Sequence, residues 1–327
     1  MKLTIAELHE QFRQVLMKNS FPEDRAILCA RIFAENSRDG IYSHGVNRFP
    51  VFIRMVTEGI IDPRAVPEKT GEMGVIEFWD GQLAPGMYSA TLAMDRAIAI
   101  AKQEGMGCVS LRNTNHWMRG GTYGWQAADA NCIGICCSNT IANMPPWGGK
   151  EPRLGNNPLV IAVPRKEGHI VLDMAMSQFS YGKLQEYELR ESQLPVAGGY
   201  DEEGEISTDP AAIRDSRRML PIGFWKGSGL SFILDVLLSS LSGGRSVAGI
   251  TARGKEYGLS QAFLCIDGKS LHADIIEEIV AFTKSSAPAQ PGQEIFYPGE
   301  KTMQTRKRNQ KDGIEVNDEI WKQVLEL

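Results

Sequence analysis

Apolar side chains recur at helical spacing near the start of the chain. Leu8, Phe12 and Leu16 fall on one face of a helix, separated by polar residues that would face solvent. Thr4 and Glu7 lie upstream at the spacing of a capping box, in which two free backbone amides are satisfied reciprocally. The pattern therefore predicts a first helix that begins after residue 4 and buries its apolar side.

Two further helices are expected before residue 60. Pro22 suits the first turn of one helix, and Gly40 lies just beyond its end. The other is expected to begin after Ser43, with Pro50 near its start, and to end at Gly59. The start of the chain is therefore predicted to be helical throughout.

The middle of the chain changes from helical periodicity to short, continuous apolar runs. Glycine and proline separate these runs, a pattern typical of buried strands, and helices are expected between some of them, at 89–104 and 121–130. This alternation predicts an α/β fold with a mixed sheet. The expected strands are Cys108–Leu111, Ile133–Cys137, Pro158–Val163, Ile170–Met174 and Phe263–Ile266.

The last third of the chain begins with a polar, turn-rich stretch, 191–220, which is expected to run over the surface. Gly223–Gly229 follows as an expected glycine-rich turn, and it leads into an apolar helix over Leu230–Leu241. Two helices close the chain, and Asn317 is the expected cap of the last. The short basic run Thr305–Arg308 is expected on a solvated helix face.

Composition narrows the class of protein. Hydrophobic residues make up 43% of the chain and charged residues 23%, as in ordinary globular proteins, and the formal net charge is -5. An acidic chain without a concentrated basic patch is poorly suited to a phosphate backbone, so no nucleic-acid partner is expected. No apolar run approaches the roughly 18 residues that span a bilayer, and the N-terminus lacks the apolar core of a signal peptide, so no membrane association is expected.

The cysteines and histidines also limit the possibilities. The six cysteines form no Cys-x-x-Cys pair, and several lie in the apolar runs. Both observations favour buried, reduced thiols and a cytoplasmic location. The five histidines are scattered without the spacing of a metal-binding motif, so no metal is expected.

His44 is the histidine with the most suggestive surroundings. It lies between Ser43 and Gly45 at the edge of the expected helix, and Arg48 follows four residues later, a spacing that shares one helical face. An arginine could hold a substrate carboxylate while the imidazolium donates a proton to a developing alkoxide. The alternative is a structural histidine at a helix start beside a surface arginine.

Polar residues beside the expected strands are further candidates. His116 belongs to the cluster Asn113–Trp117, which follows a strand at the position where α/β proteins commonly bind ligands. Asn157 precedes a strand and could bind a substrate hydroxyl, and Asp173 lies in an apolar run, where a carboxylate is costly unless paired. Each also has a structural alternative, namely a turn, a backbone partner or a helix cap.

The standard nucleotide-binding motifs are missing. No GxGxxG follows a strand, and the sequence contains neither GxxxxGK[ST] nor GxSxG. The nearest feature is Gly223–Gly229, where backbone amides and Lys226 would suit a pyrophosphate. These motifs by themselves leave the reaction open.

Taken in order, several segments resemble the type-2 malate/L-lactate dehydrogenase family, which is unrelated to the Rossmann-type lactate and malate dehydrogenases. The resemblance covers nearly the whole chain. Longer stretches, such as Tyr42–Pro50, Asn115–Gly121 and Phe179–Gly182, are most similar to a branch that reduces a diketo sugar acid. The segments that carry the family resemblance are Tyr42–Val46, Asn115–Trp117, Asn157–Pro158, Asp173–Ala175, Lys226–Gly227 and Pro298–Glu300.

The resemblance implies a family-specific, non-Rossmann cofactor-binding fold and a homodimer. It implies a helical domain made of residues 1–60 and 301–327, and a cofactor-binding and substrate domain with a mixed sheet over 61–300. The implied cofactor is NAD, with NADH preferred over NADPH. The implied substrate is a small sugar acid or 2-oxo acid.

The resemblance also assigns roles to individual residues. His44 would be the acid/base residue, with His116 and Asp173 orienting substrate or nicotinamide. Arg48 and Asn157 would bind the substrate. The cofactor would lie along His169, Ile170, Val171, Leu172, Asp173, Met174 and Ala175, at Trp225 and Lys226, and at Gly299, Glu300 and Lys301.

Two alternatives stay open at this stage. Another substrate of the same family is possible, such as malate, lactate, ureidoglycolate or a cyclic imine. A protein of another class, a sugar-acid binder without catalysis, is disfavoured by the intact motifs around His44 and Lys226.

Overall fold

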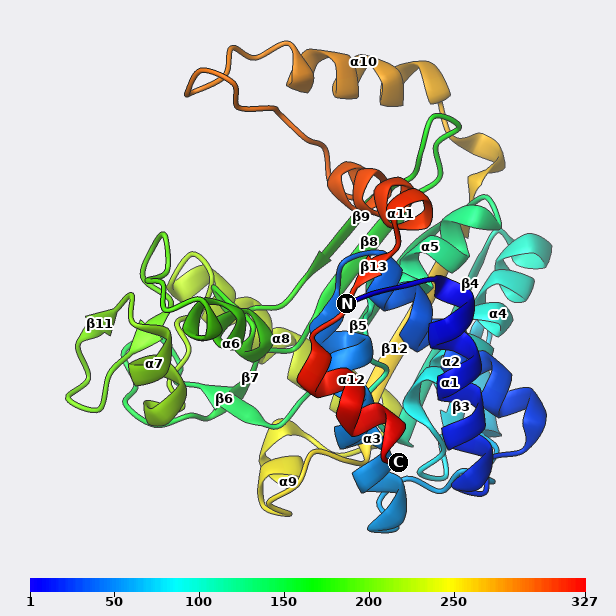
Figure 1. The fold of residues 1–327 in the computed structure, drawn as a ribbon. Coiled ribbons are helices and arrows are strands. Elements are labelled where there is room, and N and C mark those ends of the chain that lie inside the picture. Colours follow the sequence, from blue (N-terminus) through cyan, green and yellow to red (C-terminus); the bar gives the residue numbers. More distant parts are fainter.

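The protein is built around a seven-stranded mixed sheet, seen in a computed structural model that describes residues 1–327 apart from the side chain of residue 189 (Figure 1). The strand order is β2-β3-β4-β12-β5-β8-β9, and only β3 and β4 of these neighbours run parallel. The strands are β2 (Glu68–Met73), β3 (Ile76–Asp80), β4 (Met106–Thr114), β5 (Cys132–Ser138), β8 (Leu159–Val163), β9 (Ile170–Met174) and β12 (Leu259–Asp267).

Successive side chains of the central strands enter two different apolar cores. Cys136 and Phe263 pack with α4 (Gly86–Glu104) and α5 (Gly121–Asp129), whereas their neighbours Cys137 and Ala262 pack with α8 (Trp225–Ser242). A strand buried on both faces reads as a continuous apolar run, which explains why the strands were recognisable. The prediction of an α/β fold with a mixed sheet is therefore confirmed.

A separate apolar cluster joins the two ends of the chain. Strands β1 (Lys2–Leu3) and β13 (Ile314–Glu315) pair antiparallel, and the helices around them meet through tilted and edge-on aromatic rings. Phe12 and Phe49 have ring centroids 4.3 Å apart, and Trp321 lies edge-on to Phe12 at 6.4 Å. The helices of this cluster are α1 (Ile5–Lys18), α2 (Glu23–Arg38), α3 (Phe49–Thr57) and α12 (Asp318–Leu325).

Local signals located most helix ends correctly. The Thr4–Glu7 capping box is formed at the start of α1, and the side chain of Asn317 accepts two backbone N–H groups at the start of α12. All six cysteines are free and buried, as predicted. No helix among the described residues is long and apolar enough to cross a membrane.

Two local predictions were wrong. The segment Gly223–Gly229 is not a turn before the helix, because α8 already begins at Trp225 and includes Gly227 and Gly229. The third helix begins only at Phe49, after two short 3-10 turns. Gly45 separates these turns, and a Cβ there would lie 2.3 Å from the hydroxyl of Ser37.

The remaining elements lie mostly outside the sheet. The stretch 191–220 does run over the surface, with only short regular elements. The helix α10 (Ala273–Lys284) and the hairpin β2–β3 were not predicted, and α10 projects from the rest of the molecule beside α11 (Glu300–Asp312) (Figure 1). The other elements are β6 (Ala142–Met144), β7 (Leu154–Gly155), α6 (Tyr181–Leu189), β10 (Gly199–Tyr200), β11 (Ile206–Ser207), α7 (Pro210–Ser216), α9 (Val247–Thr251), a 3-10 turn (Gly268–Ser270), α10 (Ala273–Lys284) and α11 (Glu300–Asp312).

Candidate active site

The two candidate histidines meet face to face. The rings of His44 and His116 have centroids 5.6 Å apart and planes 18° apart, although they come from segments on opposite sides of α4 in the chain. His44 ends the first 3-10 turn, and its carbonyl accepts a hydrogen bond from the Asn36 side chain of α2 at 3.0 Å. The hydroxyl of Ser43 lies 3.1 Å from His44 Nδ1. Two of the predicted site residues are therefore brought together.

Both histidines are neutral in the free protein at neutral pH. Burial is the largest cause that lowers the pKa of His44 to about 3, and His116 lowers it further, whereas Asp173 opposes the shift. Burial also lowers the pKa of His116 to about 3, with a further contribution from the positive charge of Arg48. A neutral imidazole beside a second neutral imidazole has free lone pairs and can accept a proton from a ligand.

The orientation of His116 follows from its hydrogen bonds. Its Nδ1 accepts the backbone N–H of Met118 at 3.0 Å, so the ring proton resides on Nε2. That Nε2 lies 4.0 Å from Oε1 of Glu256, whose other oxygen accepts the N–H of Ile141 at 3.2 Å. Burial raises the pKa of Glu256, against the lowering effect of Arg48. A carboxyl group that the sequence did not single out thus completes this side of the cluster.

Arg48 supplies a positive charge to the site without a partner among the described side chains. Its charge reaches His44, His116 and Glu256, since it affects the pKa of each. Among the described residues, Arg48 forms no hydrogen bond or ion pair with a protein side chain. The expectation that it shares a helical face with His44 was wrong, because Gly45 interrupts the helix, but both side chains still serve one cluster.

Asp173 joins the cluster from β9. One of its carboxylate oxygens accepts Nε of Arg119 at 3.3 Å and the backbone N–H of Gly121 at 3.0 Å. Gly121 is the first residue of α5, so Asp173 caps that helix and also acts electrostatically on His44. The two alternatives that the sequence left open, a helix cap and a site carboxylate, are therefore combined in one residue.

Asn157 is fully buried and is hydrogen-bonded to other parts of the chain. Its side-chain nitrogen donates to the carbonyl of Ser231 at 2.9 Å, and its oxygen accepts the N–H of Thr140 at 3.1 Å. With a fully buried side chain and both ends of the amide occupied, Asn157 positions Thr140 in this structure. Its predicted contact with substrate stays a prediction.

The predicted cofactor segments lie along one strand. Val171 of β9 donates its N–H to the carbonyl of Pro298 at 2.9 Å, which places Gly299 beside the start of the strand. Past its end, Ile222 donates to the carbonyl of Met176 at 2.8 Å, so the chain that leads to Trp225 runs beside the residues that follow the strand. The three separated segments of the prediction therefore form one strip.

The residues of this strip fit an extended dinucleotide. Gly299 has φ +93°, and a Cβ there would lie only 3.0 Å from the backbone nitrogen of Val171, so a side chain would fill the space. At the other end Trp225 is 64% exposed, and the ammonium of Lys226 lies 5.9 Å from its ring centroid. A flat aromatic surface, a cation and a glycine where the backbone can approach closely are features that suit a nucleotide.

Other residues of the predicted strip have structural contacts. His169 accepts the N–H of Arg165 on Nδ1 at 3.1 Å, and its Nε2 lies 2.9 Å from Oδ1 of Asp129. Glu300 is paired with Lys284 of α10, and Lys301 is exposed. Arg119 and Glu256 were missed from the sequence because nothing near them in the chain marks them as partners of a distant histidine.

Comparison with known proteins identifies the family of the chain. The family described as malate/L-lactate dehydrogenase matches residues 3–325. A 2,3-diketo-L-gulonate reductase from Klebsiella pneumoniae (strain 342) is 45% identical over 334 residues, which cover 100% of both chains. A protein of the same description from Citrobacter koseri is also 45% identical over the full length.

Solved structures agree with these matches. Sulfolactate dehydrogenase from Methanocaldococcus jannaschii superposes with a TM-score of 0.90 at 30% identity, covering 100% of this chain and 96% of that one. Malate dehydrogenase from Entamoeba histolytica superposes with a TM-score of 0.94 at 26% identity, with the same coverage. The prediction of an oxidoreductase is confirmed, and the chain belongs to the malate/L-lactate dehydrogenase family.

Proposed function

We propose that the protein reduces the C2 carbonyl of 2,3-diketo-L-gulonate to give 3-keto-L-gulonate, with NADH as the reductant and His44 as the proton donor. The observation that carries the proposal is the unpaired Arg48 beside the stacked pair of His44 and His116. Such a group of residues suits a substrate that brings a carboxylate next to a carbonyl. The 45% identity to 2,3-diketo-L-gulonate reductases supports this choice of substrate.

Four side chains of the protein have separate roles in the proposed reaction. Arg48 holds the substrate carboxylate, since a guanidinium binds a carboxylate through two parallel hydrogen bonds. His116, with its proton on Nε2, donates a hydrogen bond toward the substrate oxygens or Glu256. His44 delivers a proton to the carbonyl oxygen as that oxygen becomes an alkoxide. Asp173, held by Arg119, stabilises the positive charge on His44 before the transfer.

The cofactor strip would hold the dinucleotide along His169–Ala175, with Trp225 and Lys226 at one end and Gly299–Lys301 at the other. When bound, NADH supplies the hydride that is added to the C2 carbon. The carbon gains a hydride and the oxygen gains a proton, so the ketone becomes a secondary alcohol. The preference for NADH over NADPH is part of the proposal.

His44 must gain a proton before it can give one. In the free protein the pKa of His44 is about 3, chiefly because of burial. An anionic substrate carboxylate beside His44 favours the charged imidazolium, so substrate binding raises this pKa. Substrate binding therefore favours protonation of His44, and His44 then donates this proton to the substrate.

The experiment that tests the proposal is a comparison of oxo acids by loss of NADH absorbance. We expect 2,3-diketo-L-gulonate to be reduced with a higher kcat/KM than pyruvate, oxaloacetate, sulfopyruvate or a cyclic imine acid. Faster turnover of one of these would reassign the substrate within the family. Binding of the sugar acid without oxidation of NADH would favour a binding protein instead.

We also propose that the active form is a homodimer. The helix α8 exposes Phe232, Ile233, Val236 and Leu237 on one side, each between 46% and 57% exposed. Monomeric proteins rarely leave so large a contiguous apolar surface in water. A second copy covers it through a two-fold interface, in which each chain presents the same helix.

Two further expectations remain proposals of the same kind. The division into a helical domain (1–60 with 301–327) and a sheet domain (61–300) is supported by the separate apolar cluster at the chain ends. A cytoplasmic location is supported by six free, buried cysteines.

A further inference from the structure

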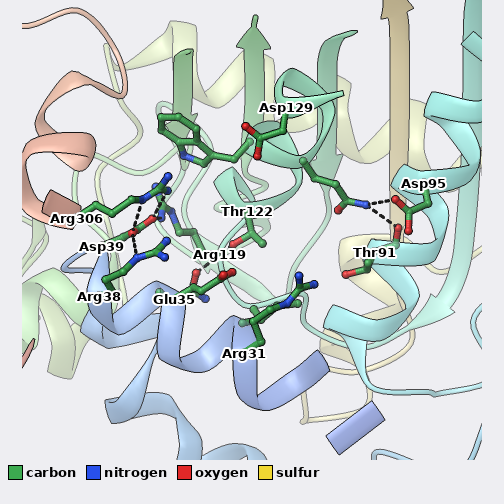
Figure 2. Close-up of a pocket in the computed structure, with 14 residues that line it drawn as sticks. Arg31, Glu35, Arg38, Asp39, Thr91, Asp95, Arg119, Thr122, Asp129 and Arg306 are labelled. Carbon is green, nitrogen blue, oxygen red and sulfur yellow. Dashed lines mark hydrogen bonds and ion pairs between the residues drawn. The ribbon is translucent and has the colours of Figure 1, made fainter. Parts of the chain in front are cut away.

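One buried carboxylate outside the predicted site gathers three arginines. Asp39, which caps the C-terminus of α2, accepts Nη1 of Arg119 at 2.8 Å and Nε of Arg38 at 3.0 Å. Arg306 of α11 binds both of its oxygens, with Nε at 2.8 Å and Nη2 at 2.7 Å. Figure 2 shows Arg38 and Asp39 from the end of α2, Arg306 from α11 and Arg119 from the loop before α5, which together line one side of a cavity of about 480 Å³.

The ionised state of Asp39 is secured by these arginines. Burial would raise the pKa of Asp39, but the hydrogen bond from Arg306 and the charges of Arg119, Arg306 and Arg38 outweigh burial and lower this pKa. The side chain is only 3% exposed. A buried charge of this kind is stable only when its partners compensate it. The position of Asp39 therefore fixes the positions of the arginines that bind it.

The same network reaches the candidate active site. Arg119 donates to Asp39 through Nη1 and to Asp173 through Nε at 3.3 Å, so one guanidinium links the two carboxylates. Arg119 is 6% exposed, which leaves its guanidinium little freedom to turn. Arg306 belongs to the helix that begins with the predicted cofactor residues, so Asp39 also anchors that helix.

We propose that Asp39 is a positioning residue of the active site, which acts through Arg119 to orient Asp173 and to set the local charge beside His44. This inference rests on the proposed function, because it assumes that His44 donates the proton. Asp39 touches neither the substrate nor the cofactor in this scheme. The charged and titratable groups that face His44 are His116 (after β4), Asp173 (β9), Arg48 (second 3-10 turn) and Arg119 (before α5).

Two substitutions should move the pH dependence of kcat in opposite directions. In Asp39→Asn the arginines lose a compensating negative charge, so the positive field at His44 grows and its pKa falls. In Arg306→Leu one positive charge is removed and Asp39 neutralises Arg119 more fully, so the pKa of His44 rises. Since kcat falls as His44 loses its proton in the complex, its midpoint shifts by about half a pH unit, down and up respectively.

The controls separate charge from packing. Asp39→Glu keeps the charge and should keep the wild-type midpoint. Asp95→Asn removes a carboxylate from the opposite wall of the same cavity, where Asp95 accepts Gln126 at 2.6 Å, and should leave the midpoint unchanged (Figure 2). If Asp39→Asn does not fold, Arg306→Leu still gives the sign of the shift, and Asp39→Glu remains the control without a shift.

The outcomes distinguish this inference from the proposed function. Opposite shifts of the midpoint in Asp39→Asn and Arg306→Leu support the positioning role. Unchanged midpoints in both variants of an active enzyme overturn it, even if their melting temperatures fall, because the network would then be purely structural. A wild type that reduces no oxo acid, or a His44→Ala variant of normal activity, overturns the proposed function and this inference with it.

Discussion

The imidazole rings of His44 and His116 are stacked 5.6 Å apart between their centroids, with the unpaired Arg48 acting on both. If His44 donates the proton, His44→Ala should lower kcat by about 10²–10⁴-fold, the range for loss of a general acid. The measurement is NADH oxidation with 2,3-diketo-L-gulonate. His272→Ala, which removes an exposed histidine at the start of α10, is the control that should keep full activity.

Arg48 should matter for the substrate rather than for the cofactor. Removal of a charged hydrogen-bond donor costs about 1.5–3 kcal/mol, so Arg48→Met should raise the KM for the oxo acid roughly ten- to hundredfold. The KM for NADH should stay near its wild-type value, and Arg48→Lys should recover only part of the loss. An equal rise in both KM values would argue against a carboxylate clamp.

Substrate binding should take up a proton. Because the pKa of His44 is about 3 in the free protein and rises when the carboxylate binds, the complex holds more protons at any pH between the two values. The affinity for the oxo acid should therefore fall as the pH rises, by up to about tenfold per unit, and become constant above the raised pKa.

Calorimetric titration in buffers of different ionisation enthalpy measures this uptake directly. The amide of the same substrate, which lacks the carboxylate, is the control and should take up no proton. A proton count of zero for the oxo acid between pH 5 and 8 would contradict the mechanism.

Prediction from the sequence succeeded where the signal was local. The strand Ile170–Met174 was located to the residue, because three consecutive apolar residues follow the turn at Gly168. The hairpin that begins with Glu68–Met73 escaped notice, because most of β2 is exposed and polar and carries no alternation. The first turn of α8 was mistaken for a loop, since glycines usually break helices, yet Gly227 has no room for a Cβ beside Ile222.

The candidate site was predictable only in part, because its contacts cross the chain. His44 and Arg48 are near neighbours in sequence, but Arg119 and Asp39 are 80 residues apart. Arg306 was expected on a solvated face, which was wrong for this residue, because its partner Asp39 lies 267 residues away. A local sequence pattern cannot indicate that Arg306 will pair with a buried carboxylate so far away in the chain.

Gly299 offers a test of the cofactor strip with a matched control. Gly299→Ala introduces a Cβ about 3.0 Å from the nitrogen of Val171 and should raise the KM for NADH about tenfold. Gly292 has a similar φ of +81°, but no atom lies within 4 Å of a Cβ there. Gly292→Ala therefore carries the same backbone strain without the contact, and it should leave this KM unchanged. Equal effects of the two variants would mean that strain alone is responsible.

If the apolar face of α8 forms the dimer interface, negative charges introduced on that face should dissociate the dimer. The double substitution Phe232→Glu with Ile233→Glu places four negative charges across a two-fold interface, so the protein should elute as a monomer with its measured mass halved. Light scattering coupled to size exclusion gives this mass. Met73→Glu, at an exposed methionine of β2, is the control that should stay dimeric. A wild type that is already monomeric at micromolar concentration refutes the proposed interface.

The pairing of Leu3 with Ile314 also determines when the chain can finish folding. Helices α1 and α2 leave the ribosome first, yet the cluster that buries them needs Trp321 and Val324 from the last helix. Contacts between such distant segments form slowly, so the early helices stay incompletely covered while the whole sheet is made. The N-terminal helices should thus be the part of the nascent chain most dependent on protection from aggregation, and a truncation before residue 314 should leave them exposed.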